Sequence, residues 1–483
     1  MALGQLLLAK KIITEAQLAR VLQEQKIAGG RFGENLVALG YVDKKTLESI
    51  LQEPPPVPKT IEETGLEINF LLNLLLRLMY ISGLQTIPDL SDQLKLTRSV
   101  VEALLTFAKN ESLVEIRGPA ENNYTLMRYA LTGAGKNRAN EALRRCEYIG
   151  AAPVPLADYQ IQVQKQTVTN EIISEERLRE ALSHLVLTPD LVRKLGPAVN
   201  SGRAILLYGG AGNGKTSIAE ALATSFQQPV YIPYCIEADG QIIKFHDEAI
   251  HTPVTQASAA NGSADSYLLP QMDHDPRWSR CRRPCVISGG ELTLEMLDLQ
   301  FDPHSKYYEA PLQMKAIGGI FIIDDFGRQR VRPHDLLNRW IYPLERKVDF
   351  LTLHTGKKFD LLFDQLVIFA TNFPPEEIMD PAQLRRVHYK LQVNPPAATD
   401  FSEIFQRVCN SYGLELTDET MAYLLNSFYL KYKLPFAGFH PKFIIEHAIA
   451  ACHYKGLPPK LTTQVLADAV ENMVISPTQQ RQP

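Results

Sequence analysis

Apolar and polar positions in residues 204–396 predict buried strands that alternate with helices. The apolar runs are "AILLY", "PVYIPY", "GIFIID", "QLVIFA" and "VHYKLQV", with helical segments between them. Strands that are apolar at every position are buried on both faces, which is typical of a parallel sheet covered by helices. This pattern predicts an α/β fold with a doubly wound parallel sheet, and the helical pattern of residues 400–475 predicts a lid.

The first 53 residues contain an internal repeat with helical spacing. "ALGQLLLAKKIITEAQLARVLQEQ" (2–25) returns as "RFGENLVALGYVDKKTLESILQE" (31–53), and each copy ends in leucines four residues apart. Thr14 and Asp43 stand at helix N-cap positions. We expect a small helical repeat domain over residues 1–53, followed by a proline-rich, extended linker over residues 54–60.

Residues 61–147 have the pattern of a winged-helix module. Helices are expected at 68–80, 89–94 and 99–108, followed by two strand-like runs and a closing helix. On the third helix, Arg98, Glu102, Thr106 and Lys109 would face outward. Because this face is mixed in charge, it favours a protein-docking or structural role, and DNA recognition is the alternative. Beyond it we expect a connector (148–195) with a helical stretch from Glu175, the α/β core (196–398), the lid (399–476) and a tail (477–483).

The segment "GGAGNGKT" (209–216) lies between a predicted strand and the helix "SIAEALATSF". It fits the G-x-x-x-x-G-K-[ST] pattern, whose glycines adopt positive φ and present backbone amides to phosphate oxygens. Lys215 would contact the β- and γ-phosphates, and the Thr216 hydroxyl would bind Mg²⁺. The predicted cofactor-binding residues are Gly209, Gly210, Ala211, Gly212, Asn213, Gly214, Lys215, Thr216 and Ser217.

Polar residues follow two other predicted strands. The run "GGIFIIDD" ends in Asp324 and Asp325, and "LVIFATN" ends in Thr371 and Asn372. Ligands of open α/β sheets bind at the carboxyl ends of the strands, so these side chains should lie near the phosphates. We expect Asp324 to hold Mg²⁺, Asp325 to orient or deprotonate the attacking water, and Asn372 to position that water.

Two consecutive arginines, Arg385 and Arg386, end a predicted helix just before the last strand. They can cap the helix C-terminus through its dipole. Alternatively, one of them acts as an arginine finger on the ATP of a neighbouring subunit, which requires a ring.

The order "GGAGNGKT", "IFIIDD", "ATN", "LRR" and a helical lid resembles the AAA+ ATPases over about residues 196–475. The resemblance implies ATP and Mg²⁺ as cofactors, Walker A and Walker B roles for the residues above, sensor 1 at Asn372 and an arginine finger at Arg385 or Arg386. In "GFHPKFIIEHA", Lys442 stands at the sensor 2 position, where that family usually has arginine. Asp325 stands where that family usually has glutamate, which implies slower hydrolysis.

The repeat of residues 2–53 resembles the N-terminal domain of GspE-type secretion and type IV pilus assembly ATPases. Some relatives of that domain bind cyclic di-GMP through an arginine and a glutamine of each copy. Here Arg31 and Gln25 are present, but Ala2 and Pro54 occupy the reciprocal positions. The resemblance therefore implies half of those contacts, and docking onto a protein partner is the simpler interpretation.

Lys215 and Asp324 are 109 residues apart (324 − 215), which indicates an insertion in the core. Asp239 and Gly240 predict a hairpin turn within it. The arginines 277, 280, 282 and 283 form a basic cluster that could contact nucleic acid or an acidic client, or could be a solvated and locally paired loop. His274, Cys281 and Cys285 allow a zinc hypothesis that lacks a fourth ligand, and Tyr307 and Tyr308 could face a pore or pack in the interior.

The net charge of −4 and the pI of about 6.3 give no overall signature of polyanion binding. Six cysteines without a tight framework suit a reducing compartment, and the apolar stretch 70–84 is short for a membrane span and carries Arg77. We therefore expect a cytoplasmic protein without membrane insertion. The expected function is that of an AAA+ ATPase that remodels or assembles a protein client. We expect it to form a homo-oligomeric ring, specifically a hexamer, with a link to secretion or pilus machinery. The alternatives are a winged-helix DNA-binding regulator and a non-hydrolysing nucleotide sensor.

Overall fold

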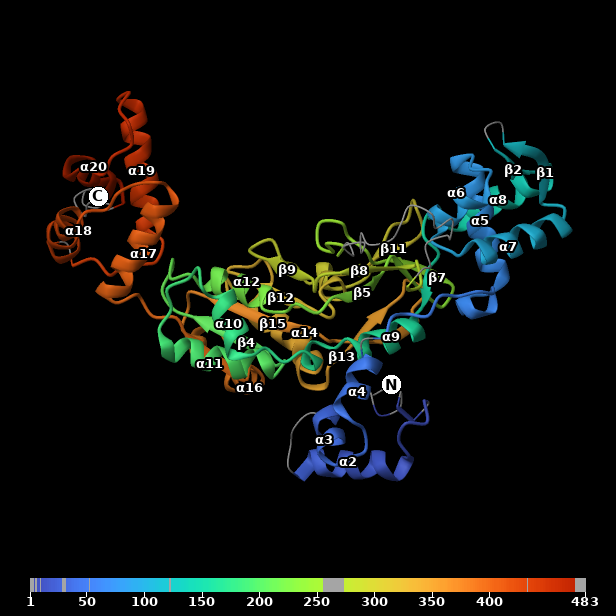
Figure 1. Cartoon of the computed structure of the whole chain (residues 1–483), viewed down its shortest axis with the longest axis horizontal. Coiled ribbons are helices and arrows are strands. Elements are labelled where there is room, and N and C mark those ends of the chain that lie inside the picture. Colours follow the sequence, from blue (N-terminus) through green and yellow to red (C-terminus); the bar gives the residue numbers. More distant parts are fainter. Residues whose placement is uncertain are drawn as a thin grey trace, which may run out of the picture.

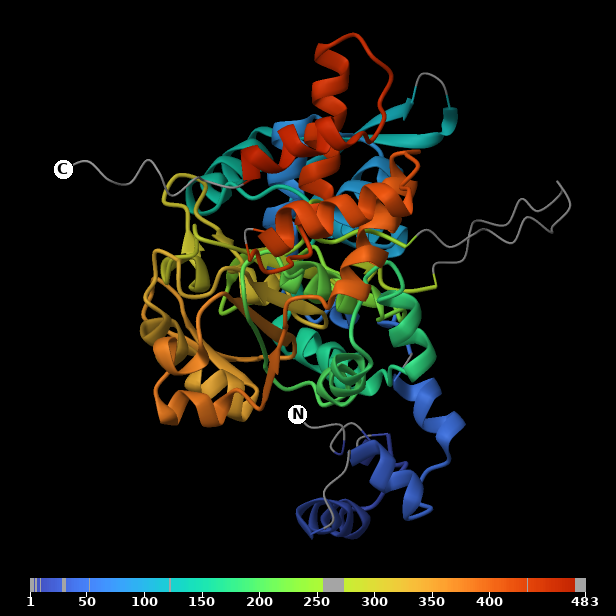
Figure 2. The same ribbon diagram turned by 90° about the vertical axis from the view of Figure 1, so that its left-hand side faces the viewer.

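The computed structural model describes residues 4, 7–8, 10–27, 32–51, 53–120, 123–254, 273–431 and 433–473. The chain forms an open arch, with a helical lid at one end, the core sheet in the middle and the winged-helix module at the other end (Figure 1). The N-terminal helices lie below the arch. Turned by 90°, the lid and the winged-helix module stand on the same side of the core, and the N-terminal helices stand on the opposite side (Figure 2).

Five parallel strands form the core sheet. Their spatial order is β16 (Tyr389–Gln392), β4 (Ile205–Tyr208), β15 (Leu366–Thr371), β12 (Ile320–Ile323) and β9 (Cys285–Ser288). If the five strands are numbered by their order along the chain, their order across the sheet is 5-1-4-3-2. All residues of β12 and β15 are buried, as expected for central strands covered on both faces. The predicted α/β fold class is confirmed.

Alternate residues of these strands feed two cores. Ile205 and Leu207 pack into one core with helix α12 (Lys215–Thr224), while Leu206 packs into the other with α14 (Pro333–Arg346). The first face is also covered by α10 (Glu175–Ala181) and α11 (Pro189–Asn200). The single helical stretch expected from Glu175 is therefore two helices, because a proline begins a new helix at position 189.

One predicted core strand belongs elsewhere. The run "PVYIPY" contains β5 (Val230–Pro233), which pairs antiparallel with β8 (Trp278–Cys281) outside the core sheet. The edge position of the core sheet is taken instead by β9, which lies in the long segment between Lys215 and Asp324. Both runs are short and apolar, so their local pattern could not tell which of them returns to the core.

The insertion builds a second lobe beside the core. Its five-stranded sheet has the order β10 (Gln300–Phe301), β11 (Tyr308–Glu309), β7 (Gln241–Lys244), β6 (Cys235–Ala238) and β3 (Val154–Pro155). The hairpin between β6 and β7 turns at Asp239 and Gly240, with φ angles of 54° and 75°, as predicted.

Two further segments complete the lobe. Helix α9 (Leu156–Lys165) and the hairpin of β13 (Val348–Thr352) and β14 (Lys358–Leu362) pack into its core. Strand β3 and helix α9 come from the expected connector, which therefore contributes to a folded unit. Short elements near the lobe and core are α13 (Leu312–Lys315), α15 (Pro375–Ile378), α16 (Pro381–Arg386) and the 3-10 turns 62–64, 168–170 and 295–297.

The winged-helix region contains the elements that the sequence predicted. These are α5 (Ile68–Ser82), α6 (Ile87–Leu94), α7 (Arg98–Asn110), β1 (Val114–Ala120), β2 (Asn123–Leu131) and α8 (Gly133–Arg145). On α7, the four predicted outward residues are exposed, and Val100, Val101, Leu104 and Leu105 are buried. The module is held against the second lobe, since Glu147 N donates to Ser305 O at 2.8 Å and the rings of Tyr148 and Tyr307 meet edge to face at 5.5 Å.

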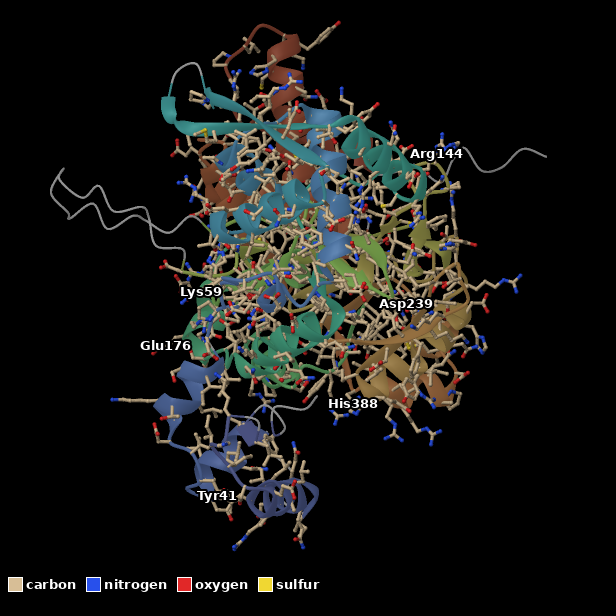
Figure 3. All side chains as sticks on the ribbon, turned by 90° about the vertical axis from the view of Figure 1, so that its right-hand side faces the viewer. Tyr41, Lys59, Arg144, Glu176, Asp239 and His388 are labelled. Atoms are coloured by element: carbon tan, nitrogen blue, oxygen red, sulfur yellow. The ribbon has the colours of Figure 1, made fainter. Side chains whose placement is uncertain are left out.

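The N-terminal module consists of α2 (Glu15–Ile27), α3 (Phe32–Ala38) and α4 (Lys44–Leu51) among its described residues. Both predicted N-caps are present, with Thr14 accepting from Gln17 N and Asp43 accepting from Thr46 N. Figure 3 shows Tyr41 in this module at the bottom and Lys59, in the linker, above it. Arg31 and Ala2, on which the cyclic di-GMP hypothesis depends, lie outside the described residues.

The linker of residues 54–60 is docked rather than free. Pro55 O accepts from Asp275 N at 3.0 Å, and Pro58 O accepts from the Thr97 hydroxyl at 2.9 Å. Prolines leave their carbonyls available as acceptors, so the extended segment can bridge the second lobe and the winged-helix module.

The lid is a separate helical cluster at the C-terminal end. It contains α17 (Ala398–Ser411), α18 (Asp418–Leu424), a π-helical turn (Leu425–Leu430), α19 (His440–Tyr454) and α20 (Thr463–Met473), which pack around a core of their own. Within the parts of the chain that the structure describes, no helix has both the length and the apolar character needed to span a membrane.

Candidate nucleotide-binding site

A loop of left-handed glycines joins β4 to α12. Gly209, Gly212 and Gly214 have φ angles of 148°, 75° and 81°, as the sequence predicted. A Cβ at Gly209 would also collide with the carbonyl oxygen of Val393, at the end of β16. Only glycine satisfies both requirements there, so the loop can turn tightly and leave its amides at the N-terminus of α12.

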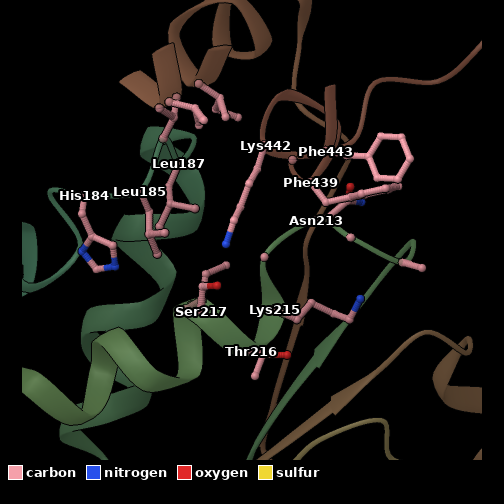
Figure 4. A pocket seen from close by; sticks show the side chains of 18 of the residues that line it. His184, Leu185, Leu187, Asn213, Lys215, Thr216, Ser217, Phe439, Lys442 and Phe443 are labelled. Carbon is pink, nitrogen blue, oxygen red and sulfur yellow. The ribbon is translucent and has the colours of Figure 1, made fainter. Parts of the chain in front are cut away.

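The lid rests on this loop. Phe439, just before α19, donates its backbone N–H to Gly212 O at 3.1 Å. A Cβ at Gly212 would collide with the Phe439 ring, so glycine is required here for the lid contact as well as for φ. Figure 4 shows Phe439 beside Asn213.

Lys215 is held by the loop and by the neighbouring strand. Its ammonium donates to Gly209 O at 3.1 Å, to Gly210 O at 2.9 Å and to Asn372 Oδ1 at 2.6 Å. Burial lowers the pKa of Lys215, and the charges of Asp324 and Asp325 oppose that shift. The three donors of the ammonium therefore have partners that are all neutral, while the carboxylates act from farther away.

Thr216 and Asp324 form the second feature of the site. The Thr216 hydroxyl lies 2.9 Å from each carboxylate oxygen of Asp324, which follows β12. A hydroxyl and a carboxylate are hard oxygen ligands of the kind that Mg²⁺ takes, with water and phosphate oxygens in its remaining positions. Thr216, at the start of α12, and Asp324, after β12, therefore fit the predicted metal.

Asn372 connects the two charged ends of the site. Its amide oxygen accepts from Lys215, and its amide nitrogen donates to Asp325 Oδ1 at 3.1 Å. Asp325 is exposed to the cleft and has a φ of 48°, which is uncommon for a residue other than glycine. Strands β4, β12 and β15 thus bring the phosphate loop, both acids and the predicted sensor to one edge.

Of the remaining predicted residues, Lys442 lines the cleft, whereas Arg385 and Arg386 do not. Lys442, on α19, lines the cleft and forms a 3.8 Å ion pair with Glu446, and Figure 4 shows it reaching from the lid toward Ser217. Arg385 and Arg386 are on α16 and are absent from the described lining of the cleft. Arg386 pairs with Glu345 at 2.8 Å, whereas the Arg385 side chain is exposed.

The cleft has a second, apolar half that no sequence motif marks. Its volume is about 920 Å³, and the lid and the segment before α11 supply apolar walls. These walls consist of Leu185, Val186, Leu187, Ile404, Val408 and Phe443. The same cleft contains His184, Arg328 and Arg407. The only signal for these residues in the sequence is that their segments flank the phosphate loop and the lid helix.

Two arginines of the basic cluster have structural roles, so the cluster is not solvated at these positions, although Arg277 has the local pairing that one alternative expected. Arg277 is buried, pairs with Asp275 at 2.8 Å and donates to the carbonyls of Thr64 and Pro153. Arg283 pairs with Glu171 at 3.0 Å. Arg277 thus has one local partner, but the two carbonyls that it binds and the Glu171 partner of Arg283 are far away in the sequence, which is why the local sequence did not predict that these arginines are buried.

The zinc and pore hypotheses also find no support in the structure. No group of three potential His, Cys, Asp or Glu ligands occurs among the described residues. His274 instead packs against the ring of Tyr231, with centroids 5.2 Å apart. Tyr308 is buried, and its hydroxyl accepts from His354 N at 2.8 Å.

Comparisons with known proteins add little beyond this geometry. Residues 397–472 match the model of a domain of unknown function, DUF8689. No curated protein matches the chain. Solved structures with similarity include NtrX from Brucella abortus in complex with ADP, at 16% identity and a TM-score of 0.37, covering 72% of this chain and 68% of that chain.

Two other solved structures come from Thermotoga maritima. A RuvB variant has 13% identity and a TM-score of 0.33, covering 64% of this chain and 74% of that chain. Domain III of the replication initiation protein DnaA has 12% identity and a TM-score of 0.34, covering 62% and 98%. Likenesses at these TM-scores carry no argument about function. The chain's own sheet order, phosphate loop and lid define its fold: a doubly wound α/β fold with a P-loop and a helical lid.

Proposed function

We propose that this protein hydrolyses ATP in the cleft between its core sheet and its lid. The observation that supports this most directly is the arrangement at the strand edge. The Thr216 hydroxyl meets Asp324, and Asn372 bridges Lys215 to Asp325, all next to a loop whose glycines present amides. Such a site offers a cation for the phosphates, a hydroxyl and a carboxylate for the metal, and a second carboxylate for the attacking water, which are the groups that hydrolysis of a triphosphate requires.

The phosphate groups would change the partners of Lys215. In the present structure its ammonium binds two loop carbonyls and the Asn372 amide. A bound phosphate offers a charged acceptor in their place, and charge-assisted hydrogen bonds are stronger than neutral ones. Asn372 would then be free of Lys215 while its nitrogen still holds Asp325.

Asp325 would orient the attacking water and accept its proton. Its carboxylate faces the cleft and is fixed by the Asn372 amide at 3.1 Å. Mg²⁺, when bound by Thr216 and Asp324, would supply charge for the phosphate oxygens. The apolar half of the cleft, with Leu185, Leu187 and Val408, suits the face of a nucleobase.

We infer a homo-oligomeric ring from the position of the arginines. Arg385 is exposed on α16 and outside the lining of its own cleft, so it can act on a nucleotide only across an interface. A hexamer is the arrangement that the resemblance to AAA+ ATPases favours. Arg386 is engaged by Glu345, which makes Arg385 the better candidate for the finger.

We propose a protein rather than a nucleic acid as the partner of the ring, which would remodel or assemble that client. The exposed face of α7 carries Glu102 between Arg98 and Lys109, so it lacks the uniform positive charge of a DNA reader. A DNA-binding regulator would instead show steeply salt-dependent DNA affinity that weakens in Arg98→Ala. All six cysteines are free, which suits a reducing compartment, and we therefore place the protein in the cytoplasm.

The test of the proposal is nucleotide binding and turnover in Lys215→Ala. We expect the wild-type chain to bind ATP with Mg²⁺ and release phosphate, and the variant to lose both. Lys194→Ala, which removes an exposed lysine on α11, is the matched control and should behave like wild type. Wild-type protein that neither binds ATP nor gains thermal stability from it would refute the proposal. Binding without turnover would favour the nucleotide sensor.

A further inference from the structure

A second cavity lies between the end of α4, helix α9 and strand β5. Its volume is about 280 Å³, and Leu51 of α4 forms part of its wall. All of its charged lining residues in the described chain are cations, namely Lys165, Arg280 and Arg283. Four more residues supply side-chain amides, namely Gln162, Gln166, Asn170 and Gln228. A cavity of this composition offers positive charge and hydrogen-bond donors.

Lys165 is the buried cation of this cavity. It is 6% exposed, and the single side-chain partner of its ammonium among the described residues is the Glu53 carboxylate at 3.4 Å. Burial lowers the pKa of Lys165, and the charge of Glu53 opposes that shift. An ammonium has three donors, so a single long contact leaves most of its capacity unused in a place where water is restricted.

Arg280 is the second available cation. Its guanidinium is half-buried and makes no hydrogen bond or ion pair with any described residue. Arg283, by contrast, is already used by Glu171 and by the carbonyls of Gln166 and Gly318. A guanidinium presents a planar fork that matches the oxygens of a phosphate group.

The rest of the wall is preorganised. Gln166 exchanges two 2.9 Å hydrogen bonds with the backbone of Tyr231, and the Asn170 amide donates to Lys165 O at 2.9 Å. These contacts fix α9 against β5, so the two cations are held by folded elements. The volume lies near the lower end of the range of about 300–1,000 Å³ that small-molecule sites occupy, which favours a small ligand.

We propose that this cavity binds the phosphate group of a small phosphorylated molecule, with Lys165 and Arg280 as its cationic ligands. In the present structure the Glu53 carboxylate takes the place of that anion on Lys165. Glu53 also pairs with Lys10 and directly precedes the linker. A phosphate on Lys165 would therefore displace Glu53 and release a contact between the N-terminal module and α9. This site is distinct from the phosphate loop and does not depend on ATP hydrolysis.

The proposal can be tested by calorimetric titration of the full chain. The Lys215→Ala background removes phosphate binding at the loop, and the probes are inorganic phosphate, ribose 5-phosphate and uncharged ribose. We expect binding of a phosphate-containing probe, weakened about tenfold or more in Arg280→Gln and in Lys165→Gln. Arg282→Gln, two residues away, exposed and outside the cavity, should bind as the background does. Glu53→Gln should tighten binding, because it removes the competing carboxylate.

The outcomes separate the sources of the ligand. Tighter binding of ribose 5-phosphate than of inorganic phosphate supports a phosphorylated small molecule, and the reverse supports free phosphate in the same cavity. Binding that is unchanged in Arg280→Gln, equal binding of ribose, or no binding at all would overturn the proposal. If Lys165→Gln fails to fold, the Arg280→Gln variant still tests the proposal, because the Arg280 side chain makes no hydrogen bond or ion pair with a described residue that folding would lose.

Discussion

The cleft and the second lobe both place arginines or lysines beside carboxylates, but they use these charges differently. In the cleft, Lys215 binds neutral groups and Asp325 is exposed, so both remain available to a ligand. In the lobe, Arg277 and Arg283 are each paired with a buried acid of the same chain. These cations are thus available to a ligand where their partners are neutral, and structural where a buried carboxylate neutralises them.

The largest expected effect concerns the carboxylate of the cleft. Asp325→Asn keeps the size of the side chain but removes the proton acceptor, so turnover should fall by about 10²–10⁴, as for loss of a general base. Nucleotide affinity should stay close to that of wild type, since Lys215 and Thr216 are intact. Steady-state phosphate release and calorimetric binding measure the two quantities. Asp335→Asn, an exposed position on α14, is the control, and equal turnover in both variants would assign the proton transfer to another group.

The next effect should come from the lobe. Arg283→Met removes one partner of the buried Glu171, and breaking a buried pair in this way costs about 3 kcal/mol of unfolding free energy. Arg282→Met removes an exposed charge and should change stability by less than about 0.5 kcal/mol. Urea unfolding followed by the fluorescence of the two buried tryptophans, Trp278 in the lobe and Trp340 in the core, measures both. Similar values for the two variants would mean that the cluster is a solvated surface after all.

This contrast shows which parts of the molecule the sequence could predict. The phosphate loop was predictable because its requirements are local: glycines at fixed spacing after a strand, then a lysine and a hydroxyl. Asp324 and Asn372 followed from the rule that parallel strands end at one edge. These predictions needed no knowledge of distant contacts.

Other features depend on partners that are far away in the chain. Arg283 is paired with Glu171, 112 residues earlier, so its local sequence reads as a basic surface. The exchange of β5 for β9 at the sheet edge has the same cause, because a short apolar run does not specify its neighbour. The apolar half of the cleft and the contact of Phe439 with Gly212 arise only when the lid packs on the core.

A smaller effect is expected from pH at Glu171. Burial raises the pKa of Glu171, but hydrogen bonds from Arg177 and from the amides of Gln227 and Gln228, together with the charge of Arg283, more than offset this. The folded-state pKa is therefore below the ordinary value, so this contribution to stability is present at neutral pH and is lost as pH falls through the folded pKa. Thermal unfolding at pH 7 and in acid should show a smaller loss for Glu171→Gln than for wild type. An equal loss would indicate that Glu171 does not titrate with folding.

The smallest effects on stability should come from the paired arginines of α16, and they separate the two interpretations of that pair. Arg386→Ala removes a partly exposed ion pair with Glu345 and a hydrogen bond to Ala382 O, which together should cost about 0.5–1 kcal/mol. Arg385→Ala removes no described contact of its side chain and should leave stability unchanged. If Arg385 reaches the nucleotide of a neighbouring subunit, Arg385→Ala should still bind ATP but lose turnover. Mixing it with Asp325→Asn subunits should then restore part of the activity, because some mixed interfaces would pair an intact arginine with an intact aspartate. If turnover is unchanged in Arg385→Ala but lost in Arg386→Ala, the arginine finger is Arg386. Its ion pair with Glu345 would then have to open when subunits meet.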